Sequence, residues 1–170
     1  MKAAMAKIGL VALLLVFISS CERKSCQDVV CQVGQQCIQG GCYCTDGYEG
    51  DGCSTYSYLK FEGSYNVTEA CNNASPNFFN YNVTIYHDPL HINQVQITNL
   101  FGLGVTAVGY IHTDGTTGKG TYLEIPYQNQ GSLTFQGQGN YDVLINRMSV
   151  QFNYTFNGGS YACTHTFYKQ

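Results

Sequence analysis

Apolar and polar residues alternate with a period of two along most of the chain after residue 58. The clearest run is 148–156, in which apolar side chains from Met148 to Phe156 alternate with polar ones. This alternation is typical of β-strands with one buried and one exposed face. It predicts eight strands, which cover residues 61–68, 81–85, 92–100, 105–112, 123–127, 133–141, 148–156 and 161–167.

Turn-forming residues such as Asp88-Pro89 separate the predicted strands. Short connections make neighbouring strands antiparallel, and a sheet of eight strands can close into a barrel that has no exposed edge. We therefore predict an all-β fold with an eight-stranded antiparallel barrel over residues 58–170, and a β-sandwich is the alternative. Ile92 breaks the phase of its strand, which indicates a β-bulge there.

Many aromatic residues fall on the inward positions of the predicted strands. A buried tyrosine hydroxyl requires a hydrogen-bond partner, which a small amphipathic ligand or ordered water would supply. A core filled by side chains is the alternative, because small barrels can be packed completely. Outward tyrosines either stack on glycans or form cross-strand pairs, as at Tyr86, Tyr122 and Tyr168. The inward candidates for ligand contact are Tyr65, Tyr81, Tyr141, Tyr154 and Tyr161.

Composition narrows the functional classes. The chain has 170 residues, a net charge of −3 and 11% charged residues. This length accommodates one ordinary domain and a small module, and the lack of basic clusters argues against nucleic acid as a partner. Nine cysteines indicate an oxidising compartment, because cytosolic thiols stay reduced.

The first 20 residues have the pattern of an export signal. Lys2 and Lys7 precede an apolar run over residues 8–18, which is shorter than the ~20 residues of a membrane-spanning helix. Ile18-Ser19-Ser20-Cys21 resembles the lipobox of bacterial lipoproteins. The resemblance implies cleavage after residue 20, lipid on Cys21 with acyl chains such as palmitate, and a lipidated tether over 21–25. An ordinary secretory signal is the alternative.

Six cysteines between residues 26 and 53 have the spacing C-x4-C-x5-C-x4-C-x-C-x8-C. Spacing alone leaves about 15 possible connectivities. The segment Cys42-Tyr43-Cys44-Thr45-Asp46-Gly47-Tyr48, followed by Gly50 and Cys53, resembles the C-terminal half of an EGF-like domain. The resemblance implies a domain over 26–53, a linker over 54–57, and the disulfides Cys26–Cys37, Cys31–Cys42 and Cys44–Cys53.

Metal binding is disfavoured in this cysteine-rich segment. A zinc site is unexpected in an exported chain that lacks paired C-x2-C motifs. Calcium-binding EGF-like domains carry acidic residues before the first cysteine, where this chain has Glu22-Arg23-Lys24-Ser25. Two cations are unfavourable beside Ca²⁺, which takes oxygen ligands. We expect a structural module without calcium.

Cys71 and Cys163 remain after these assignments. Cys71 follows the first predicted strand and Cys163 lies in the last, and these strands are antiparallel neighbours in a closed barrel. We therefore predict a disulfide between them. Gly63-Ser64-Tyr65 and the eight-strand meander resemble lipocalin-like (calycin-type) barrels, with Tyr65 in place of the usual tryptophan. The order of the segments also resembles surface lipoproteins of Bacteroidota-type bacteria.

Catalytic motifs are not evident. The chain has no Gly-x-Ser-x-Gly elbow, zinc-protease helix or phosphate-binding loop. The histidines of His87-Asp88-Pro89-Leu90-His91, with His112 and His165, are better explained as parts of turns and strands than as zinc ligands. We expect no enzyme activity, cofactor or metal. The predicted function is that of a lipid-anchored envelope protein that binds a protein, a glycan or a small amphipathic ligand. A purely structural or adhesive role is the alternative.

Overall fold

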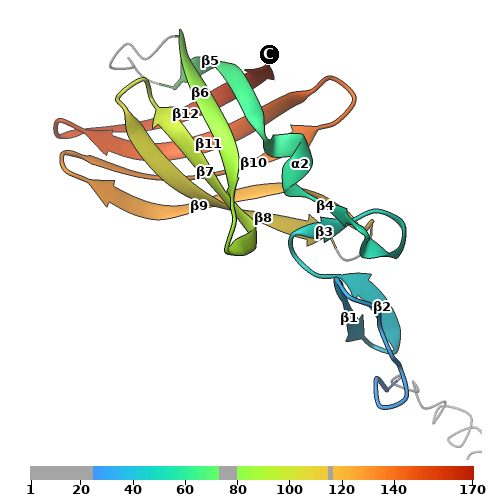
Figure 1. Ribbon diagram of the computed structural model, residues 1–170. Helices are drawn as coiled ribbons and strands as arrows, with labels where there is room; N and C mark the ends of the chain where they lie inside the picture. Colours follow the sequence, from blue (N-terminus) through green and yellow to red (C-terminus); the bar gives the residue numbers. More distant parts are fainter. Residues whose placement is uncertain (1–24, 73–79, 115–116) are drawn as a thin grey trace, which may run out of the picture.

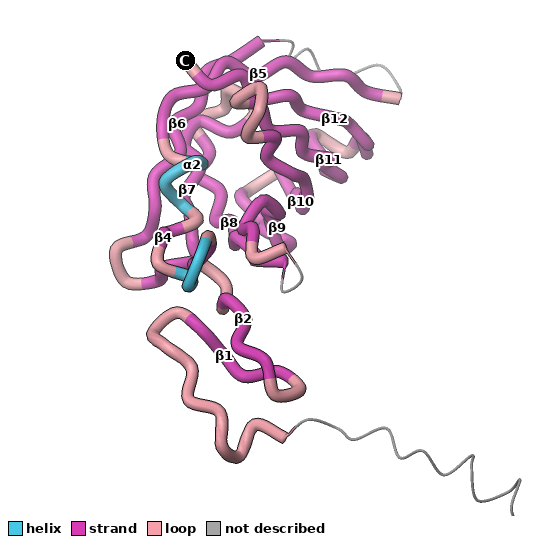
Figure 2. The backbone as a smooth tube through the Cα atoms, turned by 90° about the vertical axis from the view of Figure 1, so that its right-hand side faces the viewer, coloured by secondary structure: helices cyan, strands magenta, loops and turns pink. Residues whose placement is uncertain are grey.

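The computed structural model describes residues 25–72, 80–114 and 117–170. A small N-terminal module projects from one end of a β-barrel, and two views at right angles show the same arrangement (Figures 1 and 2). The predicted signal peptide, Cys21 and most of the tether lie outside the described residues.

Disulfides and short strands hold the N-terminal module together. Its elements are β1 (Gln35–Ile38), β2 (Gly41–Cys44), β3 (Tyr48–Glu49), the 3-10 helix η1 (Asp51–Cys53) and β4 (Thr55–Tyr56). β1 pairs with β2, and β3 pairs with β4. A module of this size cannot bury a sufficient hydrophobic core. Its disulfides stabilise it instead, because they restrict the conformations of the unfolded chain. The disulfides are Cys26–Cys37, Cys31–Cys42 and Cys44–Cys53, the pairs that the EGF-like resemblance implied.

The second part of the chain forms a closed antiparallel barrel of eight strands. Each strand pairs with the next, and the last pairs with the first, which confirms the barrel and excludes the sandwich. The expected bulge near Ile92 is also present, as a register shift between β6 and β7. The strands are β5 (Gly63–Cys71), β6 (Asn80–Asp88), β7 (His91–Leu100), β8 (Val105–Asp114), β9 (Lys119–Gln130), β10 (Leu133–Asp142), β11 (Arg147–Phe156) and β12 (Gly159–Lys169).

One predicted strand begins differently. Residues up to Phe61 form the one-turn helix α2 (Tyr58–Phe61), and β5 starts only at Gly63. The side chain of Phe61 is fully buried, and its ring packs on Tyr141 with the centroids 5.3 Å apart. Tyr65 donates a hydrogen bond from its hydroxyl to the Phe61 carbonyl at 2.7 Å. Tertiary packing thus turns the start of the alternating segment into a helix, which buries Phe61 at one end of the barrel.

Two glycines on inward positions of β10 let its neighbour approach closely. A Cβ at Gly139 would lie 2.0 Å from the Ser149 carbonyl oxygen, and one at Gly137 would lie 2.8 Å from the Phe152 ring. Any side chain at Gly139 would therefore push β10 and β11 apart.

A bulge in β9 reverses the direction of its side chains. Gln128 pairs with Phe135 while Ile125 pairs with Gly137, so β9 carries one extra residue at this point. Pro126, which has no N–H to donate to a neighbouring strand, lies within the bulge. Alternation within the predicted strand 123–127 places Tyr127 on the same inward face as Ile125, but the side chain of Tyr127 is 64% exposed. The extra residue accounts for the difference, because it shifts the phase by one position.

Side-chain amides extend the pairing between β8 and β9. The backbone pairing runs from Asp114–Lys119 to Tyr110–Glu124. Farther along, Gln128 accepts a hydrogen bond from the Val108 N–H at 2.9 Å and donates one to the Val108 carbonyl at 2.8 Å. Gln130 donates to the Thr106 carbonyl at 2.7 Å. These amides replace backbone partners, which the polar groups of β8 need.

The N-terminal module is attached to the barrel by specific contacts. Asp46 accepts a hydrogen bond from the Thr113 N–H at 2.8 Å, and its other oxygen lies 3.0 Å from Nδ1 of His112. Glu49 accepts a bond from the Gly120 N–H at 2.9 Å and pairs with Lys60. These contacts fix the module against the start of β9 and the end of β8.

The segment that was expected to be a linker, residues 54–57, is ordered into this joint. Thr55 and Tyr56 form β4, and the Ser57 N–H donates to the Gly47 carbonyl at 2.9 Å. Ser57 is fully buried, and a Cβ at Gly120 would lie 2.2 Å from its hydroxyl oxygen. The close approach of these two segments requires glycine at position 120.

Loss of the barrel disulfide should lower stability strongly. Cys71 and Cys163 are bonded across β5 and β12 with a sequence separation of 92. The chain-entropy model gives about 4 to 5 kcal/mol for a loop of this size. We expect the double variant Cys71→Ala/Cys163→Ala to lose about that much free energy of unfolding, measured by denaturant titration. The control Thr68→Ala/Thr166→Ala, a cross-strand pair on the same strands, should lose less than about 1 kcal/mol. Equal losses would contradict the entropic role.

Replacing Gln128 should weaken the contact between β8 and β9. Gln128→Leu keeps a similar side-chain size but leaves the Val108 N–H and carbonyl without their amide partner, at a cost of about 1 to 3 kcal/mol. We expect faster hydrogen exchange at the Val108 amide. In the matched control Gln130→Leu, only the bond to the Thr106 carbonyl is lost, and Val108 should exchange as in the wild type. A protected Val108 amide in Gln128→Leu would refute this role.

Candidate functional site

The outer face of the barrel carries a connected set of hollows over β9–β12. The largest has a volume of about 690 Å³, and an adjoining hollow of about 380 Å³ shares Tyr127, Gln136 and Asn153 with it. A third hollow of about 310 Å³ shares Gln138 and Gln151 with the second. We call these three hollows together the outer groove.

Carboxamides on two paired strands form the floor of the outer groove. Gln136 pairs across strands with Asn153, and Gln138 with Gln151. All four side chains are exposed. The groups alternate with buried residues on β10 and β11, so strand geometry places them on one outer face.

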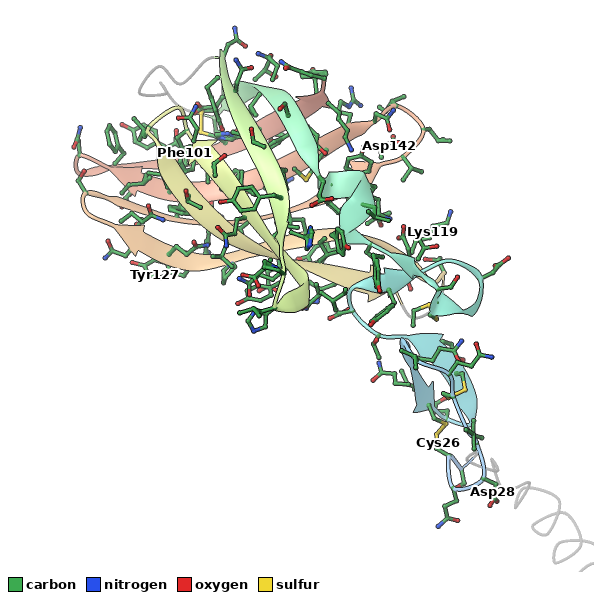
Figure 3. The ribbon with its side chains drawn as sticks, viewed as in Figure 1. Cys26, Asp28, Phe101, Lys119, Tyr127 and Asp142 are labelled. Atoms are coloured by element: carbon green, nitrogen blue, oxygen red, sulfur yellow. A yellow bond between two sulfur atoms is a disulfide. The ribbon has the colours of Figure 1, made fainter. Side chains whose placement is uncertain are left out.

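Tyr127 forms one wall of the outer groove. It lines both of the larger hollows, and the β9 bulge turns its ring out of the barrel. Tyr122 lines the third hollow and donates a hydrogen bond to Oε1 of Gln138 at 3.0 Å. Figure 3 shows Tyr127 on the opposite side of the barrel from Lys119 and Asp142. The sequence identified Tyr122 as an outward stacking candidate but missed Tyr127.

The outer groove is almost free of charge. Among the lining residues that the structure describes, Glu124 is the one ionisable acid and there is no lysine, arginine or histidine. The adjoining hollow of about 530 Å³ beside the β10–β11 turn shares Asn140 and Ser149 with the third hollow. It differs in charge, because Lys119, Asp142 and Arg147 line it, and we do not count it as part of the outer groove. The outer groove therefore offers hydrogen-bonding groups and one exposed ring, without a strong field.

Inside the barrel, the tyrosines proposed to contact a ligand find partners in the protein. Tyr65 is fully buried and bonds to the Phe61 carbonyl, and burial raises the pKa of its hydroxyl well above the usual value. Tyr141 is buried too, and donates to Oδ1 of Asn146 at 3.3 Å. Desolvation likewise raises the pKa of Tyr141. These two residues belong to the end closed by α2.

Tyr81, Tyr154 and Tyr161 lie toward the opposite end. Oη of Tyr81 lies 2.7 Å from Nδ1 of His165, and Tyr154 donates to Oε1 of Glu69 at 2.8 Å. Tyr161 is half-buried, and its ring stacks on Tyr154 with the centroids 5.1 Å apart. Protein groups thus bind the hydroxyls of the four buried tyrosines, which removes the main sequence argument for a ligand in the lumen.

His165 is a fully buried histidine in the aromatic core. The rings of Phe101 and Phe152 lie 5.3 Å and 4.8 Å from its ring centroid. Burial lowers the pKa of His165 to about 3, because a charged imidazole would lose its hydration there. Its Nε2 has no hydrogen-bond partner among the described residues. His165 therefore stays neutral and acts as a core residue.

The remaining histidines occupy separate surroundings. Nδ1 of His87 lies 2.5 Å from Oε1 of Glu62, and the ring stacks on Tyr58 at 4.1 Å. This partner lowers the pKa of Glu62 against the raising effect of its partial burial. His91 contacts Asp88, and His112 joins the module to the barrel. Pro89 and Leu90 form the turn between β6 and β7, and His87 and His91 lie in the strands on either side of it.

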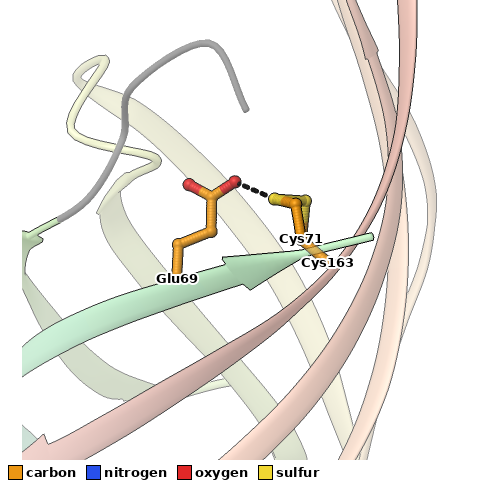
Figure 4. Close-up of side chains that lie close together, drawn as sticks. All are labelled: Glu69, Cys71 and Cys163. Atoms are coloured by element: carbon orange, nitrogen blue, oxygen red, sulfur yellow. Dashed lines mark hydrogen bonds between the residues drawn. A yellow bond between two sulfur atoms is a disulfide. The ribbon is translucent and has the colours of Figure 1, made fainter. Parts of the chain in front are cut away.

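Glu69, Cys71 and Cys163 bring three potential metal ligands within 4.8 Å of one another (Figure 4). Oε1 of Glu69 lies 2.6 Å from Sγ of Cys71. Both sulfur atoms belong to the disulfide, so neither is available as the thiolate that a metal would require. The cluster is a crosslink with a carboxylate beside it.

Comparison with known proteins leaves the chain without an assigned family. No protein-family model matches it, and no curated protein is significantly similar to it. Within the described residues, no helix has the length and apolar character needed to cross a membrane.

Buried His165 should make the fold sensitive to acid. The unfolded chain takes up a proton at the usual histidine pKa of 6.5, whereas the folded chain does so only near pH 3. The histidine's contribution is therefore complete above pH 6.5 and is lost as the pH falls toward 3, by about 2 to 3 kcal/mol at pH 4.5. We expect His165→Phe to show a correspondingly smaller loss of unfolding free energy between pH 7 and 4.5, measured with urea. Tyr141→Phe removes a buried hydroxyl at the other end of the barrel, retains the histidine and its partner, and should keep the wild-type slope. Equal slopes in wild type and His165→Phe would contradict the prediction.

Proposed function

We propose that this protein is an exported bacterial lipoprotein that acts as a non-catalytic binding module at the cell envelope. The outer groove is the observation that carries the proposal, because it combines an exposed ring with exposed hydrogen-bonding groups on a stable wall. The lipobox-like residues up to Cys21 support a lipid anchor in the outer membrane or at the cell surface. Several acyl chains hold a protein on a bilayer far better than one chain does.

Family relationships are part of the same proposal. The disulfide pairing and the Cys42-Tyr43-Cys44 motif support an EGF-like module. The closed meander that opens on Gly63-Ser64-Tyr65 supports a lipocalin-like barrel. This order of segments favours an origin in Bacteroidota-type bacteria.

The contacts of the module support a role as a rigid support. Asp46, Glu49 and Ser57 each bond to the barrel or to the joint beside it. A fixed joint would hold the barrel, and with it the outer groove, in a constant orientation relative to the tether. That arrangement suits a protein that presents a binding surface away from a membrane.

A structural or adhesive role is the second candidate. The satisfied hydroxyls of Tyr65, Tyr81 and Tyr154 favour it, because a barrel filled by its own side chains needs no small molecule inside. The two candidates differ in whether the outer surface has a specific ligand.

Removal of the lipid site should release the protein. In the full-length chain, Cys21→Ser leaves no sulfur for lipid attachment, so we expect the protein to move from the membrane fraction to the soluble fraction and to lose incorporation of labelled palmitate. Ser20→Ala keeps a small residue before the cysteine and should remain in the membrane fraction. A Cys21→Ser protein that still sediments with membranes would refute the anchor.

A further inference from the structure

We infer that the outer groove binds a neutral oligosaccharide, with Tyr127 as the stacking platform and the β10–β11 carboxamides as the hydrogen-bonding floor. This inference rests on the proposed binding function and names its ligand class. It depends on three features of the described residues: the charge of the groove, the type and spacing of its polar groups, and the exposure of one ring.

The charges that line the groove disfavour an ionic ligand. Its described lining carries no cation, and Glu124 would repel carboxylates, sulfates and phosphates. A single carboxylate is also a weak attractor for a cationic peptide on an exposed surface. A neutral, polar ligand is the class that remains.

The polar groups of the floor match hydroxyl groups. Each carboxamide provides both a donor NH₂ and an acceptor oxygen, and a sugar hydroxyl likewise donates and accepts. The side chains of Gln136, Gln151 and Asn153 make no hydrogen bond to any part of the protein that the structure describes. They are therefore available to a ligand without breaking an existing bond.

The floor has the length of an extended ligand. Outward positions follow one another along β10 from Thr134 to Asn140, a distance of ~20 Å at the usual strand rise. Each of these outward positions on β10 has a cross-strand partner on β11, for example Gln138 opposite Gln151, so polar side chains form two parallel rows. A linear chain of several sugar rings could contact successive pairs.

Tyr127 supplies the apolar contact that such a ligand needs. Its ring is 64% exposed, and it stands where the two larger hollows meet. An exposed tyrosine ring offers an apolar face at little entropic cost, against which the apolar face of a pyranose can pack. A protein partner would instead be expected to use several apolar anchors, and Tyr127 is the single large exposed apolar side chain described in these two hollows.

The test uses the full chain, extracted in detergent and applied to an array of neutral and anionic oligosaccharides. We expect binding to at least one neutral class, and Tyr127→Ala should weaken that binding roughly tenfold or more. Tyr127→Phe retains the ring face and should bind nearly as well as the wild type. The matched control is Tyr86→Ala, which removes a 40% exposed tyrosine from β6, outside the groove.

Three results would overturn the inference. One is an array on which no neutral glycan binds, and another is binding that Tyr127→Ala leaves unchanged. The third is binding of anionic glycans alone, lost in Lys119→Ala/Arg147→Ala, which would place the ligand in the hollow beside the β10–β11 turn. Each leaves the membrane anchor intact, because Cys21→Ser fractionation tests that separately. Circular dichroism of every variant checks that the barrel remains folded.

Discussion

Pairing of β12 with β5 is the constraint on which the rest of the structure depends. It turns an eight-stranded sheet into a closed wall, and the Cys71–Cys163 disulfide ties the two strands together. Closure removes both sheet edges and separates the side chains into an inner and an outer set. The inner set buries its aromatic residues together, including Phe101, Phe152 and Phe167.

Because the buried tyrosine hydroxyls bond to other groups of the protein, the polar side chains open to a ligand lie on the outside of the barrel. Tyr81 bonds to His165, and Tyr154 bonds to Glu69, so these hydroxyls are used within the wall. The extra residue in β9 has two opposite effects on that wall. It exposes Tyr127, and it directs the amide of Gln128 to the backbone of β8. One irregularity thus both shapes the outer groove and preserves the closure of the barrel.

The N-terminal module depends on crosslinks and on contacts with the barrel. Three disulfides replace a hydrophobic core, and Asp46 and Glu49, which lie between β2 and α2, accept hydrogen bonds from the barrel. His112 lies between Asp46 of the module and Glu124 of the groove, at 3.0 Å and 2.9 Å. The joint and the proposed binding surface therefore share a side chain, which links the position of the module to one side of the groove.

Local pattern was sufficient for the positions of the strands, the faces of most of their side chains and the bond between Cys71 and Cys163. These features follow from a period of two and from the meander order, both of which are readable residue by residue. The EGF-like resemblance supplied the other three disulfides. Local pattern was insufficient for Phe61, which tertiary packing draws into a helix, and for Tyr127, whose face depends on the register between β9 and β10. It was also insufficient for the partners of Tyr81 and Asp46, which lie 84 and 67 residues away in the sequence. Register and distant contacts arise only when the sheet closes, so the hydrogen bonds of the buried tyrosines and the outer groove are properties of the assembled barrel.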